Sequence, residues 1–212
     1  MQEPTVSEGY RKAAYPILKL FLQRWSPRAF DGSPMLARDL FTMFEAARWA
    51  PSGFNSQPWR FLYALRDDPY WERFLGLLIP FNISWARNAS ALIYVLSQTS
   101  IANGDDLLPS HSHSFDAGAA WAFLALQARS LGYDSHGMSG VDFARARIEL
   151  AIPDSLRIEA AVAIGRQGNP SSLPESLRAR EVPSDRKPLD HMVFHGQLAE
   201  SPGLPDSGPP SS

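Results

Sequence analysis

The chain has 212 residues, of which 44% are hydrophobic, and a formal net charge of −2 at pH 7. This length and composition predict one compact domain with short tails, and the scattered basic residues exclude the electrostatic footprint of a nucleic-acid or anionic-membrane binder. Because the sequence contains no cysteine, it excludes disulfides, thiolate metal sites, cysteine nucleophiles and iron–sulfur clusters, so any redox chemistry requires a bound cofactor.

The N-terminal region, residues 1–23, is predicted to be an arm that precedes the main domain. Residues 1–7 are polar and lack the apolar segment of a secretory signal, and no apolar run approaches the roughly 20 residues that span a bilayer. We therefore expect a cytoplasmic protein that does not enter a membrane. Apolar residues recur at helical spacing over 8–23, and Pro16 predicts that the helix itself begins near that residue.

The following chain alternates helical patterns with short apolar runs. Helical spacing predicts helices over residues 36–50, 69–78, 81–88, 115–131 and 141–150. Apolar or aromatic runs predict buried strands over residues 59–65, 91–96 and 159–165. Small residues fill the fourth of these helices, so we expect it to be central and closely packed, with Gly132 ending it. A few strands among many helices indicate an α+β or three-layer domain.

Proline, serine and charged residues dominate the chain from Gly168 onward, apart from the short apolar stretch 192–194. We expect the main domain to occupy residues 24–196. Residues 197–212 are predicted to be a disordered tail, because a Ser/Pro/Gly composition cannot bury enough apolar surface to order a chain.

Several common catalytic motifs do not occur in the sequence. It contains no G-x-G-x-x-G, G-x-x-x-x-G-K-[ST], H-E-x-x-H or G-x-S-x-G pattern. The motifs typical of Rossmann dinucleotide-binding proteins, P-loop NTPases, zincin metalloproteases and α/β-hydrolases are therefore absent from the sequence. The pairs His111/His113 and His191/His195 have no evident carboxylate to complete a metal site, and no metal is expected.

The first segment with chemical potential is RWSPRAF, residues 24–30. Arg24 and Arg28 offer two fixed cations, with the hydroxyl of Ser26 between them, directly after a predicted helix. Guanidinium groups match phosphate oxygens bidentately and stay charged in almost any surroundings. A basic surface turn of no special function would produce the same pattern.

The second segment is the loop APSGFNSQPW, residues 50–59, which precedes a predicted strand. Asn55 and Gln57 each carry a donor and an acceptor, so together they can read the edge of a planar heterocycle. The alternative is a turn whose amide side chains bond only to the backbone. The third segment, GYDSHGMSGVD at 132–142, is expected to be a glycine-rich turn that exposes backbone N–H groups, or a plain helix entry capped by Ser139 or Asp142.

In this order the segments resemble the nitroreductase family, over roughly residues 20–195. The resemblance lies in R-x-S-x-R at the start, A-P-S-x-x-N-x-Q-P-W in the loop, A-x-x-x-G-Y after the central helix, M-x-G-V-D in the turn and R-K-P-L at 186–189. It implies an α+β fold of three layers, with a central mixed sheet flanked by helices, in an intertwined homodimer that binds FMN where the subunits meet.

The resemblance also implies roles for individual residues. Arg24, Ser26 and Arg186 fall on the family's phosphate positions, Arg28 near the ribityl chain or the N1/O2 side of the ring, and Trp25 contributes mainly through its backbone. The loop residues Pro51, Ser52, Asn55 and Gln57 fall near the pyrimidine edge and the ribityl hydroxyls. The backbone of Gly137, Met138, Ser139 and Gly140 falls near the reactive N5 edge. Residues 97–115 match no family pattern.

The implied function is an FMN-dependent oxidoreductase with ping-pong kinetics. NADH or NADPH would give hydride to the flavin, and a small-molecule acceptor such as a nitroaromatic or quinone would then be reduced, without a side-chain nucleophile. Two alternatives stay open: a non-catalytic protein that binds or stores FMN, and a specialised branch acting on halogenated phenols, on flavin itself or on peptide heterocycles.

Overall fold

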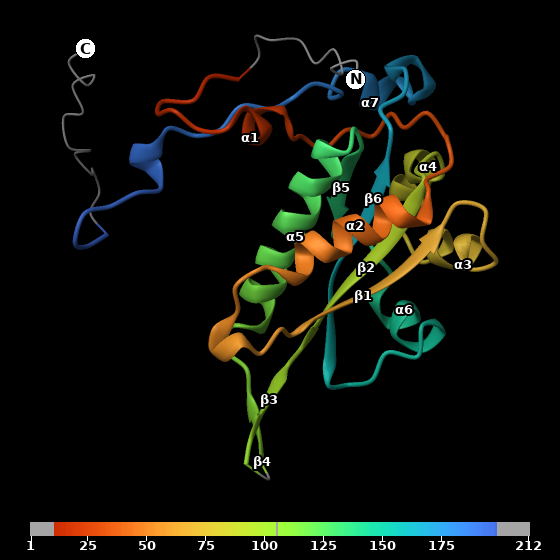
Figure 1. Ribbon diagram of the computed structural model, residues 1–212. Helices are drawn as coiled ribbons and strands as arrows, with labels where there is room; N and C mark the ends of the chain where they lie inside the picture. Colours follow the sequence, from red (N-terminus) through yellow and green to blue (C-terminus); the bar gives the residue numbers. More distant parts are fainter. Residues whose placement is uncertain (1–10, 105, 199–212) are drawn as a thin grey trace, which may run out of the picture.

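The computed structural model describes residues 11–104 and 106–198, so residues 1–10 of the expected arm and 199–212 of the expected tail lie outside it. Its main sheet has four strands in the order β1–β2–β6–β5 (Figure 1). Their bounds are Trp59–Leu65 for β1, Ala91–Gln98 for β2, Asp134–Met138 for β5 and Leu156–Gly165 for β6. The three strands predicted from apolar runs are thus confirmed, and β5 is an addition.

All neighbouring strands of this sheet are antiparallel, so the expectation of a mixed sheet was wrong. For the pairs β1/β2 and β5/β6, the reason lies in the helices that connect the strands. Parallel neighbours need a crossover that returns along the full strand, but α3 (Trp71–Gly76), α4 (Pro80–Ala86) and α6 (Phe143–Glu149) have only six or seven residues. Each is therefore about 10 Å long, too short to carry the chain back to the far end of the sheet.

Two hydrophobic cores cover the two faces of the sheet, which gives three layers and confirms the predicted fold class. Alternate residues of β2 enter different cores: Leu92, Tyr94 and Leu96 pack towards α3, α4 and α6. Ile93 and Val95 instead pack towards α2 (Ala37–Arg48) and α5 (His113–Ser130). Since side chains alternate across a strand, the continuous apolar run of β2 is what burial on both faces requires.

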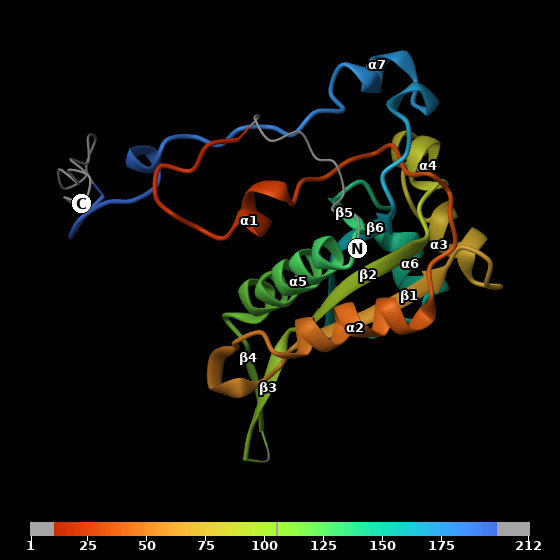
Figure 2. The ribbon, with the colours of Figure 1, turned by 45° about the horizontal axis from the view of Figure 1, so that its top comes forward.

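Helix α5 is the closely packed helix that its small residues predict. Ala117, Ala120 and Ala128 are fully buried, and α2 packs beside α5 on the same face of the sheet, where its Phe44 contacts Phe61 of β1 (Figure 2). Gly132 follows the end of α5 with a φ of 79°, a left-handed conformation that ends a helix and favours glycine. Its predicted role as the helix terminator is confirmed.

A two-stranded hairpin, β3 (Ser100–Asn103) and β4 (Asp106–Pro109), projects from the end of β2 away from the body (Figure 1). Its sequence gave no strand prediction. Short elements complete the described chain: the 3-10 turns η1 (Gly53–Asn55), η2 (Pro170–Ser172) and η3 (Leu189–His191), and the helix α7 (Glu175–Arg178). Within residues 11–104 and 106–198, no helix is long and apolar enough to cross a membrane.

Two arms leave the body together (Figure 2). The N-terminal arm, residues 11–24, contains α1 (Lys19–Gln23), which begins three residues after Pro16, and the C-terminal arm comprises residues 183–198. Arg11 joins them, because its Nε donates to the carbonyl of Ser184 at 2.8 Å. Residue 11, where the described N-terminal arm begins, is therefore held beside the first residues of the C-terminal arm.

The chain that follows the N-terminal arm is fastened to the end of β6. Phe30 pairs with Gln167, and the amide of Gly168 donates to the carbonyl of Ala29 at 2.7 Å. A Cβ atom at residue 168 would lie 2.7 Å from the carbonyl carbon of Phe30. Only glycine permits this close approach, which fixes the segment 24–30 on the body.

Candidate functional site

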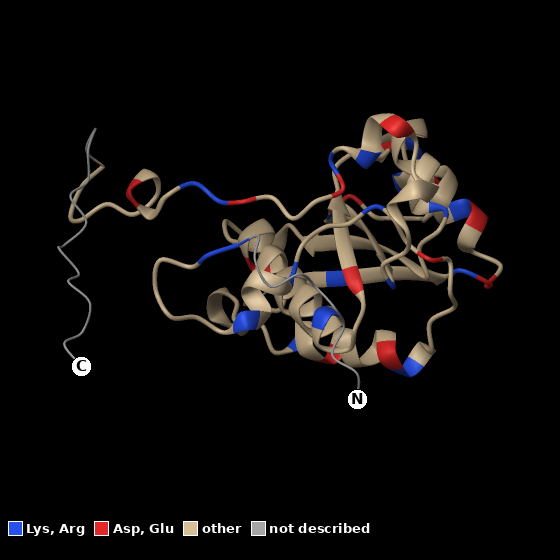
Figure 3. Ribbon diagram, turned by 90° about the horizontal axis from the view of Figure 1, so that it is seen from above, with Lys and Arg blue, Asp and Glu red and all other residues tan. Residues whose placement is uncertain are grey.

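The clearest polar cavity of the described structure lies where the two arms meet the body. It has a volume of about 430 Å³ and is lined by Arg11, Arg24, Trp25, Ser26, Arg28, His136, Arg180, Val182, Ser184 and Arg186. Five of these ten residues are arginines, and none of the described lining residues is an acid. Basic residues also occur elsewhere on both arms and on the body (Figure 3), whereas here five arginines line one cavity. We call it the arginine cavity.

The arginines are held by bonds to nearby chain. Nη1 of Arg24 donates to the hydroxyl of Ser26 at 3.3 Å and to the carbonyl of Trp25 at 3.2 Å. Nη1 of Arg186 donates to the hydroxyl and the carbonyl of Ser184, both at 3.2 Å. Nη1 of Arg11 donates to the carbonyl of Arg24 at 2.8 Å. These bonds fix the positions of the guanidinium groups. Their acceptors are uncharged hydroxyl and carbonyl oxygens, so the positive charges are not neutralised.

Mutual repulsion shows in the pKa values of these arginines. Burial lowers the pKa of Arg24 below its usual value, Arg11 and Arg186 lower it further, and Asp134 opposes them. Burial also lowers the pKa of Arg28, with Arg180 acting in the same direction and Glu181 against it. A bound anion would relieve this repulsion, so the cavity is suited to a phosphate-sized group.

Glu181 anchors the segment that carries Arg28. One carboxylate oxygen of Glu181 accepts the backbone N–H groups of Arg28 and Ala29, each at 2.7 Å, and the side chain is buried. The buried Nε of Arg28 has no hydrogen-bond partner in the part of the chain that the structure describes. A buried donor without a partner is costly, and a ligand in the cavity that accepts from Arg28 would satisfy it.

His136 of β5 lines the arginine cavity as a neutral side chain. Burial lowers its pKa to about 4, and Arg28 and Arg24 add to the effect although the Pro27 carbonyl opposes it. Nδ1 of His136 lies 2.9 Å from the carbonyl oxygen of Pro27. Because a carbonyl can only accept, Nδ1 carries the proton and Nε2 is the ring's acceptor.

This pKa makes the stability of the fold pH-dependent. The unfolded histidine takes up its proton near pH 6.5 and the folded one only near pH 4, so the stability that His136 contributes is present above pH 6.5 and is lost as the pH falls towards 4. We expect His136→Gln to reduce the loss of unfolding free energy between pH 7 and pH 4.5 by about 2 kcal/mol. Urea unfolding of both proteins at each pH measures this, and identical losses in the two proteins would contradict it.

The loop 51–58 has an unusual backbone. Phe54, Asn55 and Gln57 all have positive φ values, of 52°, 53° and 48°, a conformation that costs free energy in residues other than glycine and often marks functional sites. The amide of Gln57 donates to the hydroxyl of Ser52 at 3.0 Å, and Nε2 of Gln57 donates to the carbonyl of Asn55 at 3.0 Å. Some of the loop's hydrogen-bonding groups are therefore bonded within the loop itself. This agrees in part with the alternative of a turn whose amide side chains bond to the backbone.

The segment 137–140 differs from the turn that was expected. Gly137 and Met138 belong to β5, where they pair with Val162 and Ala161 of β6. The strand forms because β6 has an open edge, and pairing satisfies backbone groups that a turn would leave to water. Only the following residues turn, with the Gly140 carbonyl accepting from the amide of Ile79 at 3.1 Å. Asp142 caps α6, as one interpretation expected, by accepting the amide of Arg145 at 3.0 Å.

The predicted site residues fall into two groups at opposite ends of α5. Arg24, Trp25, Ser26, Arg28 and Arg186 meet in the arginine cavity, near Asp134 and the last turn of α5. Pro51, Ser52, Asn55 and Gln57 lie by the first turn, where Asp116 accepts the amide of Gly53 at 3.1 Å. The 18 residues of α5 span about 27 Å, so the two groups do not form one compact site within a single chain.

Sequence reasoning missed five residues of the arginine cavity: Arg11, His136, Arg180, Val182 and Ser184. The contact between Arg11 and Ser184 joins residues 173 positions apart, and no local pattern indicates it. Arg180 had a weak signal, because it lies in an arginine-rich stretch shortly before Arg186. His136 stood inside the third segment but was not selected.

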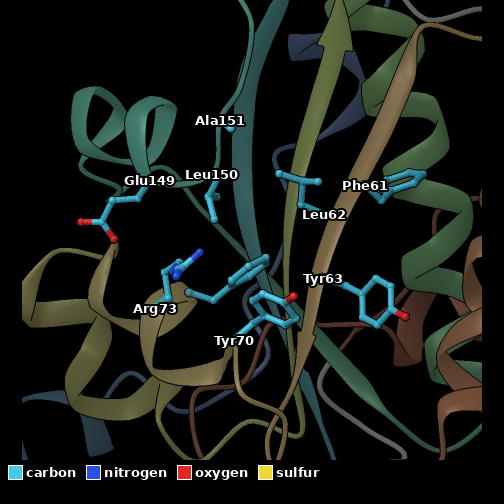
Figure 4. Close-up of a pocket in the computed structure, with 9 residues that line it drawn as sticks. Phe61, Leu62, Tyr63, Tyr70, Arg73, Glu149, Leu150 and Ala151 are labelled. Atoms are coloured by element: carbon cyan, nitrogen blue, oxygen red, sulfur yellow. The ribbon is translucent and has the colours of Figure 1, made fainter.

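A second cavity, of about 390 Å³, lies at the outer edge of β1 and has a different chemistry. Its lining is mainly aromatic and aliphatic, with Arg73 and Glu149 as its charged members. Figure 4 shows Leu62 on the side of β1 that faces Tyr70, and Tyr63 on the opposite side. A single arginine beside an acid does not favour a phosphate, so the arginine cavity is the better anion site.

Comparison with known proteins identifies the family. The profile of the nitroreductase family matches residues 21–166, more than half of the chain. The chain therefore belongs to the nitroreductase family, as its motifs predict.

Individual relatives agree with this assignment. A solved structure described as the oxidoreductase containing FMN is 49% identical, with a TM-score of 0.89, over 92% of this chain and 98% of its own. A nitroreductase in complex with FMN from Exiguobacterium sibiricum shares the fold at 21% identity, with a TM-score of 0.68, over 86% of this chain and 98% of its own. A Rhodopseudomonas palustris protein named as an NADH dehydrogenase/NAD(P)H nitroreductase is 27% identical over 143 residues, 58% of this chain and 71% of its own.

Proposed function

We propose that the protein is an FMN-dependent oxidoreductase that passes hydride from NADH or NADPH to a small oxidised acceptor, such as a nitroaromatic or a quinone. The observation that carries the proposal is the arginine cavity, whose five arginines and lack of acids among its described lining residues suit the phosphate of FMN. Its setting in a nitroreductase fold supports the flavin as the group attached to that phosphate. Residues 24–196 would form the flavin-binding domain.

The residues present fit the cofactor. Arg24, Ser26 and Arg186 would hold the phosphate, since all three line the cavity and the two arginines are already fixed by local bonds. Arg28 would use its unpartnered Nε on the flavin, and its cation would stabilise negative charge there. The backbone of residues 137–140 would lie beside the cofactor, because β5 is an outer strand and carries His136 in the cavity wall.

When bound, FMN supplies the two-electron chemistry, accepting hydride from the nicotinamide and giving electrons to the acceptor. The protein's task is to bind the cofactor, to orient it and to keep one of its faces open. The neutral His136 adds no further positive charge at pH 7, and the arginines supply the positive potential.

We propose further that the protein works as a homodimer, with each flavin between two chains. None of the described residues 11–24 and 187–198 is buried, although the arms expose Ile17, Leu18, Phe21, Met192, Val193 and Leu198. Apolar arms that leave the body are suited to covering a second copy. The loop 51–58 of one chain would then complete the arginine cavity of its partner, which accounts for the separation of the two groups along α5.

Sedimentation of the purified protein with FMN tests this arrangement. A dimer that releases its flavin when dilution dissociates it is the expected result, because each site would draw residues from both chains. A monomer that stays fully loaded with flavin would contradict the shared site.

A further inference from the structure

The loop 51–58 needs an external constraint to keep its conformation. Three of its residues, Phe54, Asn55 and Gln57, have positive φ values without being glycine, and such residues persist in this conformation only where their surroundings enforce it. Phe54 contributes no packing, because its side chain is 98% exposed. The bonds among Ser52, Asn55 and Gln57 are internal to the loop, so they shape it without placing it on the body.

A buried carboxylate at the start of α5 supplies a constraint from the body. Asp116 is only 2% exposed, and its Oδ2 accepts the amide of Gly53 at 3.1 Å and the hydroxyl of Ser112 at 2.9 Å. A charged side chain is rarely buried without such partners. The bond reaches the loop two residues before Asn55, at the point where the chain enters η1.

Gly53 lies close against the start of α5. A Cβ atom there would lie 2.9 Å from Oγ of Ser112 and 3.8 Å from Oδ2 of Asp116, so a side chain at this position would require the Ser112 hydroxyl to move from its bond to Asp116. Gly53 of the loop thus contacts two residues that lie far from it in the sequence, Ser112 at the N-cap of α5 and Asp116 in its first turn.

We infer that Asp116 is a positioning residue, which holds the loop 51–58 so that Asn55 and Gln57 present their amides to the edge of the flavin ring. This inference rests on the proposed function for the ligand, but the contact between Asp116 and Gly53 exists without it. Asp116 itself does not touch the ligand. Its effect is to order the loop before FMN binds, so that binding does not have to supply that order.

Amide hydrogen exchange, resolved by residue in the flavin-free full chain, tests the contact directly. In the parent protein the Gly53 amide should exchange at least about tenfold more slowly than an unstructured amide, because it donates to Oδ2 of Asp116 at 3.1 Å. Asp116→Ala should remove this protection, about tenfold or more, because hydrogen bonds to charged groups are strong. Asp116→Asn keeps an acceptor oxygen and should stay within about threefold of the parent.

FMN titration of the same proteins tests the consequence. Asp116→Ala should raise the Kd for FMN about tenfold, with Asp116→Asn restoring it. Asp68→Ala is the matched control, because Asp68 also accepts backbone amides, those of Leu65 and Tyr70 at 2.8 Å, but in a turn away from the loop. It should leave both the Gly53 exchange and the FMN affinity unchanged.

The outcomes separate the inference from the proposed function. Unprotected Gly53 in the parent, or a Gly53 amide unaffected by Asp116→Ala, would overturn the inference whether or not FMN binds. Faster exchange with unchanged FMN affinity would also overturn it, since the loop's order would then not matter to the flavin. A parent protein that protects Gly53 but does not bind FMN would refute the proposed function while leaving the contact intact.

Discussion

Arg24→Met and Arg186→Met are each expected to weaken FMN binding by about 10- to 100-fold, while riboflavin binding changes by less than about threefold. Riboflavin lacks only the phosphate, and a charge-assisted bond contributes about 1.5–3 kcal/mol. Both side chains line the arginine cavity, and methionine keeps much of their apolar stem. Quenching of flavin fluorescence, measured with both ligands, gives the two affinities.

The same comparison has a matched control and a salt test. Arg38→Met removes an arginine whose side chain is 83% exposed on α2, and it should alter neither affinity. Added salt should weaken FMN binding to the parent more than to either cavity variant, because screening acts on the charges that remain. Equal losses of FMN and riboflavin affinity would show that these arginines do not recognise the phosphate.

Arg11→Lys is expected to weaken FMN binding about tenfold although it keeps the positive charge. The Arg11 guanidinium bonds to three carbonyls on the two arms: Ser184 at 2.8 Å, Arg24 at 2.8 Å and Leu22 at 3.2 Å. A lysine ammonium is a compact point charge that cannot reproduce this planar fork. Without the fork, the arms that carry Arg24 and Arg186 lose their fixed separation, which we expect to cost about 1.4 kcal/mol of binding.

A third protein separates position from charge. Arg11→Met removes both the fork and the cation, and it should weaken FMN binding only slightly more than Arg11→Lys if position is what Arg11 contributes. Proteolysis should also cut the arms of both variants faster than those of the parent, because the bond between the arms is gone. Parent-like FMN affinity in Arg11→Lys would mean that Arg11 acts only through its charge.

The sheet and the principal helices follow from local sequence patterns. The predicted limits of β1 agree with the structure at both ends, and the apolar runs of β2 and β6 mark strands buried on both faces. Such runs are strong signals because burial on two faces removes the polar alternation. The small residues of α5 predicted its close packing for a similar reason.

The elements that were missed depend on contacts distant in sequence. The segment Asp134–Met138 contains serine, histidine and glycine, which predict a turn, and only the edge of β6 makes it a strand. Strand formation here reflects tertiary context rather than propensity. The direction of the strands was also mispredicted, since it depends on how far the short connecting helices carry the chain.

The candidate site could be predicted only in part, for the same reason. Arg24, Ser26 and Arg28 share a short motif, and Arg186 was found through the resemblance to the family. Arg11 reaches the cavity only because the two arms run together. The division of the predicted residues between the ends of α5 also depends on tertiary structure, because sequence order does not show how far apart two loops lie.

The most direct test of the proposed function is the absorbance spectrum of the FMN-loaded protein during anaerobic addition of NADH and then NADPH. Bleaching of the flavin band by at least one donor, and recovery of the band when a quinone or nitroaromatic is added, is the predicted result. A flavin band that stays oxidised with both donors would contradict the reductase and favour a protein that binds or stores flavin. No flavin band even after incubation with FMN would contradict the arginine cavity as a phosphate site.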